Sequence, residues 1–149
     1  LALYGHSPVS NLHGEIGLQP ALSVKAKVTF IRVVPKGVGV SYGHSFITQR
    51  PTRLAVVGIG YADGVSRALS GRMTALINSK PLPQVGSITM DQLILDATDH
   101  HDVQVGSVVT LLGRDGESHI TTQQWSDWSS SIPWEVLCGF KNRLPRIEI

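Results

Sequence analysis

One stretch decides the fold class: Leu22-Ser23-Val24-Lys25-Ala26-Lys27-Val28-Thr29-Phe30. Apolar residues occupy every second position from Leu22 to Phe30, and Ser, Lys and Thr occupy the positions between them. Because successive side chains of a strand point to opposite faces, this alternation predicts a β-strand with a buried apolar face, Phe30 included, and a wet polar face. Pro35-Lys36-Gly37 is expected to end the strand as a turn, since Pro fixes φ and Gly permits a positive φ.

Further strands are expected along most of the remaining chain. The continuous apolar run 54–59 has the length of a fully buried strand. Residues 73–77 and 84–89 flank Asn78-Ser79-Lys80-Pro81, which predicts a hairpin. Shorter strands, bounded by turn residues, are expected at 38–41, 93–96, 108–112 and 118–120.

The pattern changes after residue 120. Thr121 or Thr122 is suited to cap a helix that runs to about Ser131, because a hydroxyl accepts from an unpaired amide of the first turn. Pro133 is expected to begin a second short helix, since Pro is tolerated at the first helical position. The sequence therefore predicts a mostly β fold, a small β-barrel or sandwich of short strands, with a minor helical segment near the C-terminus.

Composition limits the classes of protein to consider. The 149 residues fit one domain, 1–149, and the hydrophobic share of 42% against 16% charged residues argues for a folded chain. A net charge of +2 without a basic stripe argues against nucleic acid as a partner, and the apolar runs are too short to cross a membrane. The single cysteine, Cys138, cannot form an internal disulfide, so a cytoplasmic location is expected. The chain begins at Leu1 rather than Met, and we expect it to belong to a longer protein.

The candidate chemical groups are few. The six His residues do not form a set with ligand spacing, so no metal site is predicted, and neither a nucleophile elbow nor a phosphate-binding glycine loop is present. Tyr42, in Val40-Ser41-Tyr42-Gly43, has two interpretations. It is either an aromatic packing residue with its hydroxyl at the surface, which residue physics alone favours, or an acid or base. The second role requires a phenol pKa of about 10 to be lowered by a nearby cation.

Five motifs occur in an order and spacing that resemble alanine racemases. They are Leu1-Ala2-Leu3-Tyr4-Gly5, Val40-Ser41-Tyr42-Gly43, Gly58-Ile59-Gly60-Tyr61-Ala62-Asp63-Gly64, Val85-Gly86-Ser87-Ile88-Thr89-Met90-Asp91-Gln92 and Arg143-Leu144-Pro145-Arg146. Each motif alone is modest, and the ordered set is specific. The resemblance implies that this chain is the C-terminal β domain of such an enzyme.

The same resemblance implies what surrounds the domain. An N-terminal α/β barrel, upstream of Leu1 and absent from this chain, would hold pyridoxal phosphate (PLP) through a Schiff-base lysine. The β domain would pack over the barrel of a second subunit in a homodimer. The full-length protein would interconvert L- and D-alanine for peptidoglycan synthesis, and the 149-residue chain alone would be inactive.

Residue roles follow from the resemblance position by position. Tyr42 matches the catalytic Tyr, which faces the cofactor lysine across the substrate. Met90 matches a residue whose backbone amide binds the substrate carboxylate, and Asp91 borders the same pocket. Tyr61 matches an aromatic residue that narrows the substrate-binding channel to small amino acids.

The remaining matches concern the cofactor and the entrance. Leu1 and Trp134 match positions at the PLP phosphate, and Arg67 lies in the outer channel. The chain departs from the family twice: Trp134 replaces a common Tyr, and Ser87 replaces an Arg found in many members. These departures leave open a broad-specificity amino-acid racemase, and a non-catalytic β module that binds a partner is a further alternative.

Overall fold

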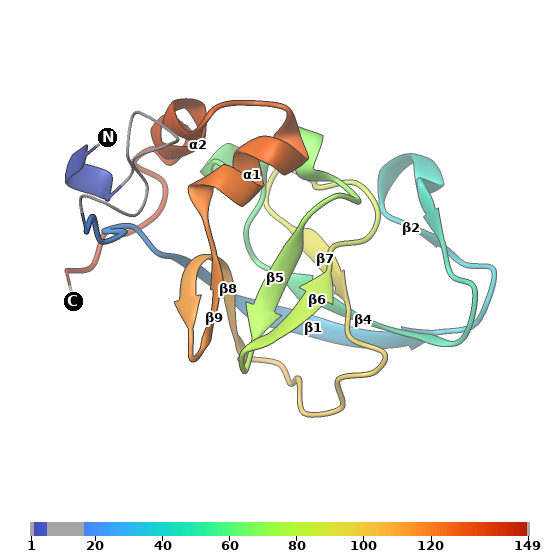
Figure 1. Ribbon diagram of the computed structural model, residues 1–149. Coiled ribbons are helices and arrows are strands. Elements are labelled where there is room, and N and C mark those ends of the chain that lie inside the picture. The colour runs from blue at the N-terminus through green and yellow to red at the C-terminus, as the bar shows by residue number, and fades with distance from the viewer. Residues whose placement is uncertain (1, 6–16, 149) are drawn as a thin grey trace.

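The computed structural model describes residues 2–5 and 17–148. Within them, antiparallel strands form a seven-stranded sheet with the order β6-β5-β8-β1-β4-β7, and β9 pairs with β8 off this path (Figure 1). The strands of this sheet are β1 (Val24–Val34), β4 (Thr52–Val57), β5 (Thr74–Ile77), β6 (Lys80–Pro83), β7 (Leu93–Asp96), β8 (Val108–Asp115) and β9 (Ser118–Ile120). A second sheet pairs β2 (Gly39–Val40) with β3 (Phe46–Ile47).

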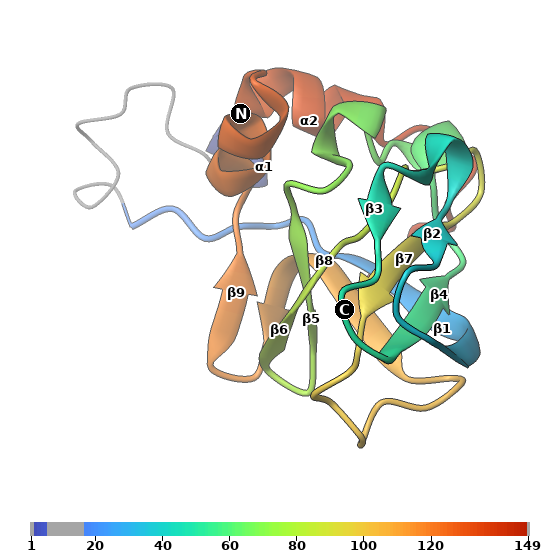
Figure 2. The ribbon, with the colours of Figure 1, turned by 90° about the vertical axis from the view of Figure 1, so that its right-hand side faces the viewer.

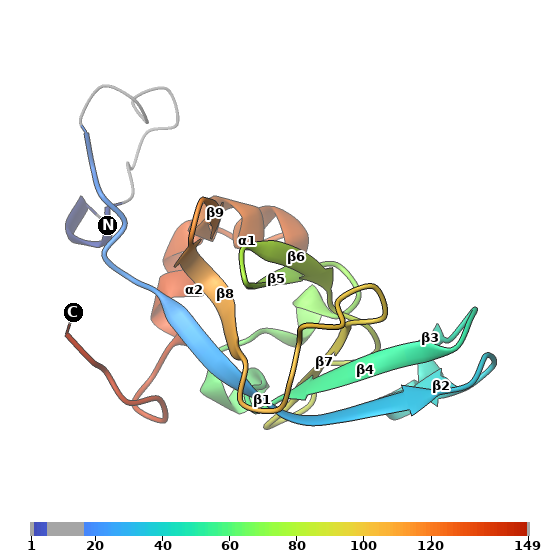
Figure 3. The ribbon, with the colours of Figure 1, turned by 90° about the horizontal axis from the view of Figure 1, so that it is seen from below.

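Strand β1 joins the two parts of the large sheet. Its first residues pair with β8 and its later residues pair with β4, and the register shifts between Val28 and Phe30 (Figure 3). The predicted strand is confirmed, and it is longer than expected. The prediction that Phe30 is buried is wrong: its side chain is 55% exposed. A bulge adds one residue to the strand, and the alternation of faces therefore changes phase beyond Val28.

The hairpin after β5 differs from the sequence prediction. Asn78 and Ser79 both adopt a positive φ, 53° and 64°, as a two-residue type I′ turn requires. The second strand is therefore β6 at 80–83, and the prediction of a strand at 84–89 is wrong. Strand β6 contains two prolines, Pro81 and Pro83. They are tolerated here because β6 lies at the end of the sheet order, where a missing amide leaves no partner unpaired.

The two ends of the sheet approach each other at the residues that directly follow β6 in the chain. Gln84 and Leu95 form an isolated antiparallel bridge, and the Val85 amide donates to the Ile94 carbonyl at 2.9 Å. No ladder pairs β6 with β7 in the described residues. The prediction of a mostly β fold is confirmed, and the sheet is an open path whose ends meet at one bridge.

Both predicted helices are present. Helix α1 (Thr122–Ser129) begins after Thr121, whose hydroxyl accepts from the Gln124 amide while the Gln124 side chain accepts from the Thr121 amide. Helix α2 (Pro133–Gly139) begins at Pro133, as expected for a residue without an amide hydrogen. The helices lie together at the top of the sheet in Figure 1.

Trp125 fixes α1 to the main core. The side chain is 2% exposed, its indole Nε1 donates to the Leu111 carbonyl at 2.8 Å, and its ring lies 5.6 Å from that of Phe140. Burial of a ring of this size stabilises the folded state by about 2–3 kcal/mol. The hydrogen bond removes the cost of burying the polar N–H.

A smaller cluster supports β2 and β3, which with their connecting turn form the β2–β3 arm (39–47). Val34, Val40, Leu54 and Val85 are buried together there, and Phe46 packs against them. The cluster fixes the arm to the sheet, where it projects beside β4 and β7 (Figure 2).

Candidate functional site

Tyr42 lies at the tip of the β2–β3 arm. It begins the 3-10 turn Tyr42–His44, and its side chain is 75% exposed. Among the described residues, none forms a hydrogen bond with its hydroxyl. The prediction that Tyr42 follows a short strand at the rim is confirmed, and the phenol points away from the core of this domain.

The backbone on both sides of Tyr42 is unusual. Ser41 has φ 61° and ψ −171°, and Gly43 and His44 have φ 71° and 49°. Residues other than glycine rarely adopt such values, so Ser41 and His44 each destabilise the folded state by about 1–3 kcal/mol. Gly39 allows the turn to fold back, because a Cβ there would lie 2.5 Å from the His44 ring.

Segment 86–87, which is distant from the Tyr42 turn in sequence, contacts that turn in the fold. The Ser41 hydroxyl donates to the Ser87 carbonyl at 2.7 Å, and the Ser87 hydroxyl donates to the Tyr42 carbonyl at 2.9 Å. Gly86 has φ 73°, and a Cβ on it would lie 2.8 Å from the Val40 carbonyl oxygen. Two of the motifs in the sequence are therefore in direct contact.

Tyr61 and Met90 lie beside each other on two hydrogen-bonded segments. The Tyr61 amide donates to the Thr89 carbonyl and the Ala62 amide to the Met90 carbonyl, each at 3.0 Å. A Cβ on Gly60 would lie 2.3 Å from the Thr89 oxygen, so this close approach requires glycine. Tyr61 and Met90 are 46% and 52% exposed. No described residue accepts a hydrogen bond from the Met90 amide, which leaves that donor available at the rim.

Arg143 connects the loops that carry Tyr61 and Met90. Its Nε lies 3.1 Å from the Asp63 carboxylate and its Nη2 lies 2.6 Å from the Asp91 carboxylate. Asp63 is buried, and its other oxygen accepts from the Gly60 amide at 2.9 Å. The hydrogen bond with Asp91, followed by the charge of Asp63, raises the pKa of Arg143 above its ordinary value. We call these three residues the ionic bridge.

The other predicted site residues lie on α2, on a 3-10 turn and at the start of the chain. Trp134 is the second residue of α2 and is 43% exposed, and Arg67 is the exposed first residue of the 3-10 turn Arg67–Leu69. Leu1 lies outside the described residues. Close packing of Gly64 on the Gly139 carbonyl, which a Cβ would approach to 2.7 Å, brings the Tyr61 loop against the end of α2.

These contacts join the segments that carry Tyr42, Met90, Tyr61 and Trp134 into one rim. The Tyr42 turn contacts segment 86–87, segment 89–90 contacts the Tyr61 loop, and that loop contacts α2. In Figure 2 the turn between β2 and β3, the segment before β7 and α2 gather in the upper part of the domain. We call this region the functional rim.

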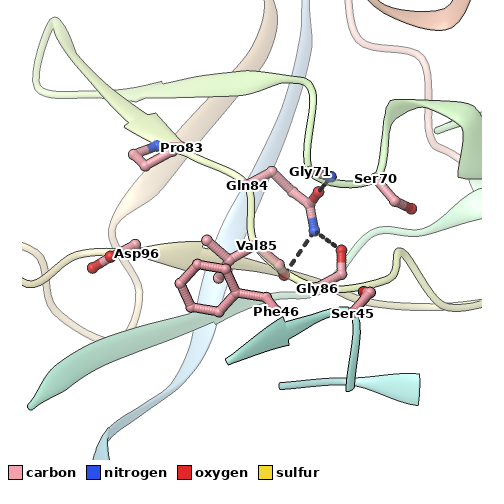
Figure 4. A pocket seen from close by; sticks show the side chains of 9 residues that line it. All are labelled: Ser45, Phe46, Ser70, Gly71, Pro83, Gln84, Val85, Gly86 and Asp96. Atoms are coloured by element: carbon pink, nitrogen blue, oxygen red, sulfur yellow. Dashed lines mark hydrogen bonds between the residues drawn. The ribbon is translucent and has the colours of Figure 1, made fainter. Parts of the chain in front are cut away.

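A pocket of about 400 Å³ lies beside the β2–β3 arm, which carries the Tyr42 turn. Ser45 and Phe46 line it from the arm, and the buried side chain of Gln84 lines it from the sheet (Figure 4). The Gln84 amide is fully engaged: its nitrogen donates to the Val85 and Gly86 carbonyls at 2.9 Å each, and its oxygen accepts from the Gly71 amide at 2.6 Å. The Gln84 side chain in the wall of the pocket therefore supports the backbone of segment 85–87.

The other described parts of the chain carry fewer groups suited to catalysis or metal binding. Over residues 2–5 and 17–148, no group of three or more His, Cys, Asp or Glu side chains converges as metal ligands would. Asp99 and Asp102 form surface ion pairs with Arg50 and Lys80. No helix among the described residues has the length and apolar character needed to cross a membrane.

Sequence reasoning missed the residues that hold the rim in place. It noted Ser87 as a departure and Arg143 as part of a motif, without their contacts with Tyr42 and Asp91. Gln84 was expected in a strand, and no local pattern distinguishes its buried amide from a surface one. The polar residues inside two motifs, Ser41 and Arg143, were the signals available.

The fold and the rim define a β domain that carries the exposed side chains of Tyr42, Tyr61 and Met90 on tightly held turns. The profile described as "Alanine racemase, C-terminal domain" matches residues 21–148, and the chain belongs to this family. Its resemblance to alanine racemases, recognised from five motifs, is thereby confirmed.

Curated relatives match over the whole chain. They include alanine racemases from Prochlorococcus marinus, 66% identical, and from Nostoc sp., 50% identical, each over 149 residues. Each alignment spans 100% of this chain and 39% of the length of the relative.

Solved structures of alanine racemases also match over nearly the whole chain. Alanine racemase from Bacillus anthracis with bound L-Ala-P superposes with a TM-score of 0.92 at 38% identity, covering 99% of this chain and 38% of that one. The enzyme from Bartonella henselae with covalently bound pyridoxal phosphate gives 0.88 at 40% identity, covering 99% and 40%.

Proposed function

We propose that this chain acts as the C-terminal domain of a PLP-dependent alanine racemase and supplies Tyr42 as one of its two proton-transferring groups. Membership of the family and the names of the relatives support the class of reaction. The exposed Tyr42 phenol, carried on a strained turn, is the single observation that carries the residue assignment. Strain of this kind clusters at functional sites.

The residues of the rim fit a bound amino acid next to PLP. An N-terminal barrel would hold the cofactor, which when bound would supply an electron sink for the substrate α-carbon. The available Met90 amide is a donor of the kind that binds a carboxylate, and the Tyr42 hydroxyl both donates and accepts. Donors and acceptors of this chain therefore suit the substrate side of the site, while the cofactor lysine belongs to the barrel.

Tyr42 provides the proton exchange on one face of the substrate. Racemisation removes the α-proton from one face and returns a proton to the opposite face, so two groups are needed. The phenol donates its proton in one direction, and its deprotonated form accepts a proton in the other. The barrel lysine acts on the opposite face.

The remaining assignments concern the surroundings of this reaction. Asp91 borders the substrate pocket, Tyr61 and Arg67 form its entrance, and Leu1 and Trp134 approach the cofactor phosphate. The β domain packs over its own barrel and that of a second subunit in a homodimer. The enzyme supplies D-alanine for peptidoglycan in the cytoplasm, and the 149-residue chain alone lacks racemase activity.

The test is Tyr42→Phe in the full-length protein, with Tyr61→Phe as the matched control. Loss of an acid–base group lowers kcat by about 10²–10⁴-fold, whereas loss of an entrance hydroxyl is expected to lower it less than about tenfold. Racemase assays with L- and D-alanine measure both. Equal losses in the two variants would mean that Tyr42 has only a structural role.

A broad-specificity amino-acid racemase is the second candidate. Trp134 and Ser87 favour it, since both replace family residues near the entrance. Rates with alanine, serine and lysine distinguish the two candidates. A strong preference for alanine supports the first proposal, and equal rates would replace it with the second.

A further inference from the structure

The position of the Tyr42 phenol depends on its backbone. The side chain is 75% exposed, and none of the described residues bonds to its hydroxyl. Within this domain, the ring therefore takes its place from the turn that carries it. Any group that fixes this turn also fixes the backbone position and direction from which the phenol projects.

The turn has a conformation that does not persist without support. Ser41 adopts φ 61° and ψ −171°, a region that residues other than glycine rarely occupy. Gly43 and His44 continue the positive φ values. Such a backbone is retained only where the surrounding structure determines it.

Two serine hydroxyls supply the support. Ser41 Oγ donates to the Ser87 carbonyl at 2.7 Å, and Ser87 Oγ donates to the Tyr42 carbonyl at 2.9 Å. We call this reciprocal pair the serine clamp. Its bonds lie on either side of the strained peptide and join residues that are 46 and 45 positions apart.

The clamp is fixed to the interior of the domain. The Gln84 amide nitrogen holds the Val85 and Gly86 carbonyls directly before Ser87 (Figure 4). Gln84 is 2% exposed, so this support is shielded from water. The Ile88 amide, directly after Ser87, donates to the Ser70 hydroxyl at 2.9 Å. Ser87 is thus held on both sides.

From this geometry we propose that Ser87 is the positioning residue for Tyr42. Its hydroxyl holds the Tyr42 carbonyl and keeps the phenol aligned with the substrate. The inference rests on the proposed function of Tyr42 and extends it. Ser87 stands where many members of the family have Arg, and a short hydroxyl side chain here bonds the turn directly.

The experiment compares Ser87→Ala with Ser87→Thr, which keeps a hydroxyl, in the full-length protein. Ser118→Ala is the matched control, because the Ser118 hydroxyl also donates to a backbone carbonyl, that of Ser79, at 2.7 Å. Ser118 lies on β9, far from the β2–β3 arm in Figures 1 and 3. Hydrogen exchange of the 40–47 backbone amides and racemase kinetics are measured for each variant.

We expect Ser87→Ala to accelerate exchange at 40–47 by about five- to tenfold, since the bond of the Ser87 hydroxyl to the Tyr42 carbonyl and its weaker 3.4 Å contact with the Ser45 hydroxyl are lost. Its kcat should fall by about tenfold or more, with KM for alanine little changed, because a small displacement of a reacting group costs rate rather than binding. Ser87→Thr should restore both values, and Ser118→Ala should alter neither.

Unchanged exchange in Ser87→Ala would overturn the clamp. Faster exchange with unchanged kcat would overturn the positioning role. Full activity of Tyr42→Phe would overturn the proposed function instead, and the exchange data would then still decide whether Ser87 holds the turn.

Discussion

The Tyr42 turn and the Met90 segment lie on the same rim and are held by different forces. Neutral hydroxyls and a small apolar cluster fix the turn. Charges of Asp63, Arg143 and Asp91 fix the loops beside Met90. Neutral hydrogen bonds are nearly indifferent to salt, whereas partly exposed ion pairs are screened by it. The comparison indicates that the Tyr42 turn and the Met90 segment respond to different solution conditions.

The largest expected effect is that of Asp63→Ala on the Met90 side. The substitution removes the buried acceptor of the Gly60 amide and one partner of Arg143. A hydrogen bond to a charged group contributes about 1.5–3 kcal/mol, so the free energy of unfolding should fall by about that amount. Urea denaturation of this chain measures it.

Ser41→Ala is the matched variant on the Tyr42 side. It removes one neutral hydrogen bond, that of Ser41 Oγ to the Ser87 carbonyl, which contributes about 0.5–1.5 kcal/mol. A loss in Ser41→Ala as large as that in Asp63→Ala would show that charge gives the ionic bridge no added strength, and the comparison would fail.

Salt should separate the two regions by a smaller margin. Arg143 and Asp91 are 49% and 57% exposed, and at 1 M salt the screening length is only about 3 Å. We expect 1 M NaCl to accelerate amide exchange at 89–92 by about two- to threefold, relative to low salt, and to leave exchange at 41–46 unchanged. Arg143→Met is the control, since it should abolish this salt effect. Equal acceleration at both segments would contradict the distinction.

Local patterns in the sequence predicted the elements that depend on neighbouring residues. The alternation at 22–30 predicted β1, and Thr121 and Pro133 marked the starts of α1 and α2. At the two helix starts, the side chain acts on its own backbone or on a backbone group a few positions away. Such interactions survive whatever tertiary structure surrounds them.

Features that depend on distant partners were not predictable. The bulge that exposes Phe30 arises where β1 changes from β8 to β4 as its partner. The bond of Ser87 to Tyr42 joins positions 45 residues apart. The sequence identified Tyr42 and Met90 through family motifs, and only the fold shows what holds them in place.

The smallest expected effect concerns pH. The bond with Asp91 and the charge of Asp63 raise the pKa of Arg143, so its contribution to stability is complete below the ordinary pKa and is lost only at higher pH. Arg143→Lys replaces it with a group whose ordinary pKa is about 10.4. We therefore expect the thermal midpoints of the two proteins to diverge as pH rises from about 9 to 11, by a few degrees at most. Ser87→Ala should keep a constant difference from the parent over this range, because a hydroxyl clamp does not titrate there. A constant difference for Arg143→Lys as well would mean that the charge of residue 143 does not stabilise the Met90 side of the rim.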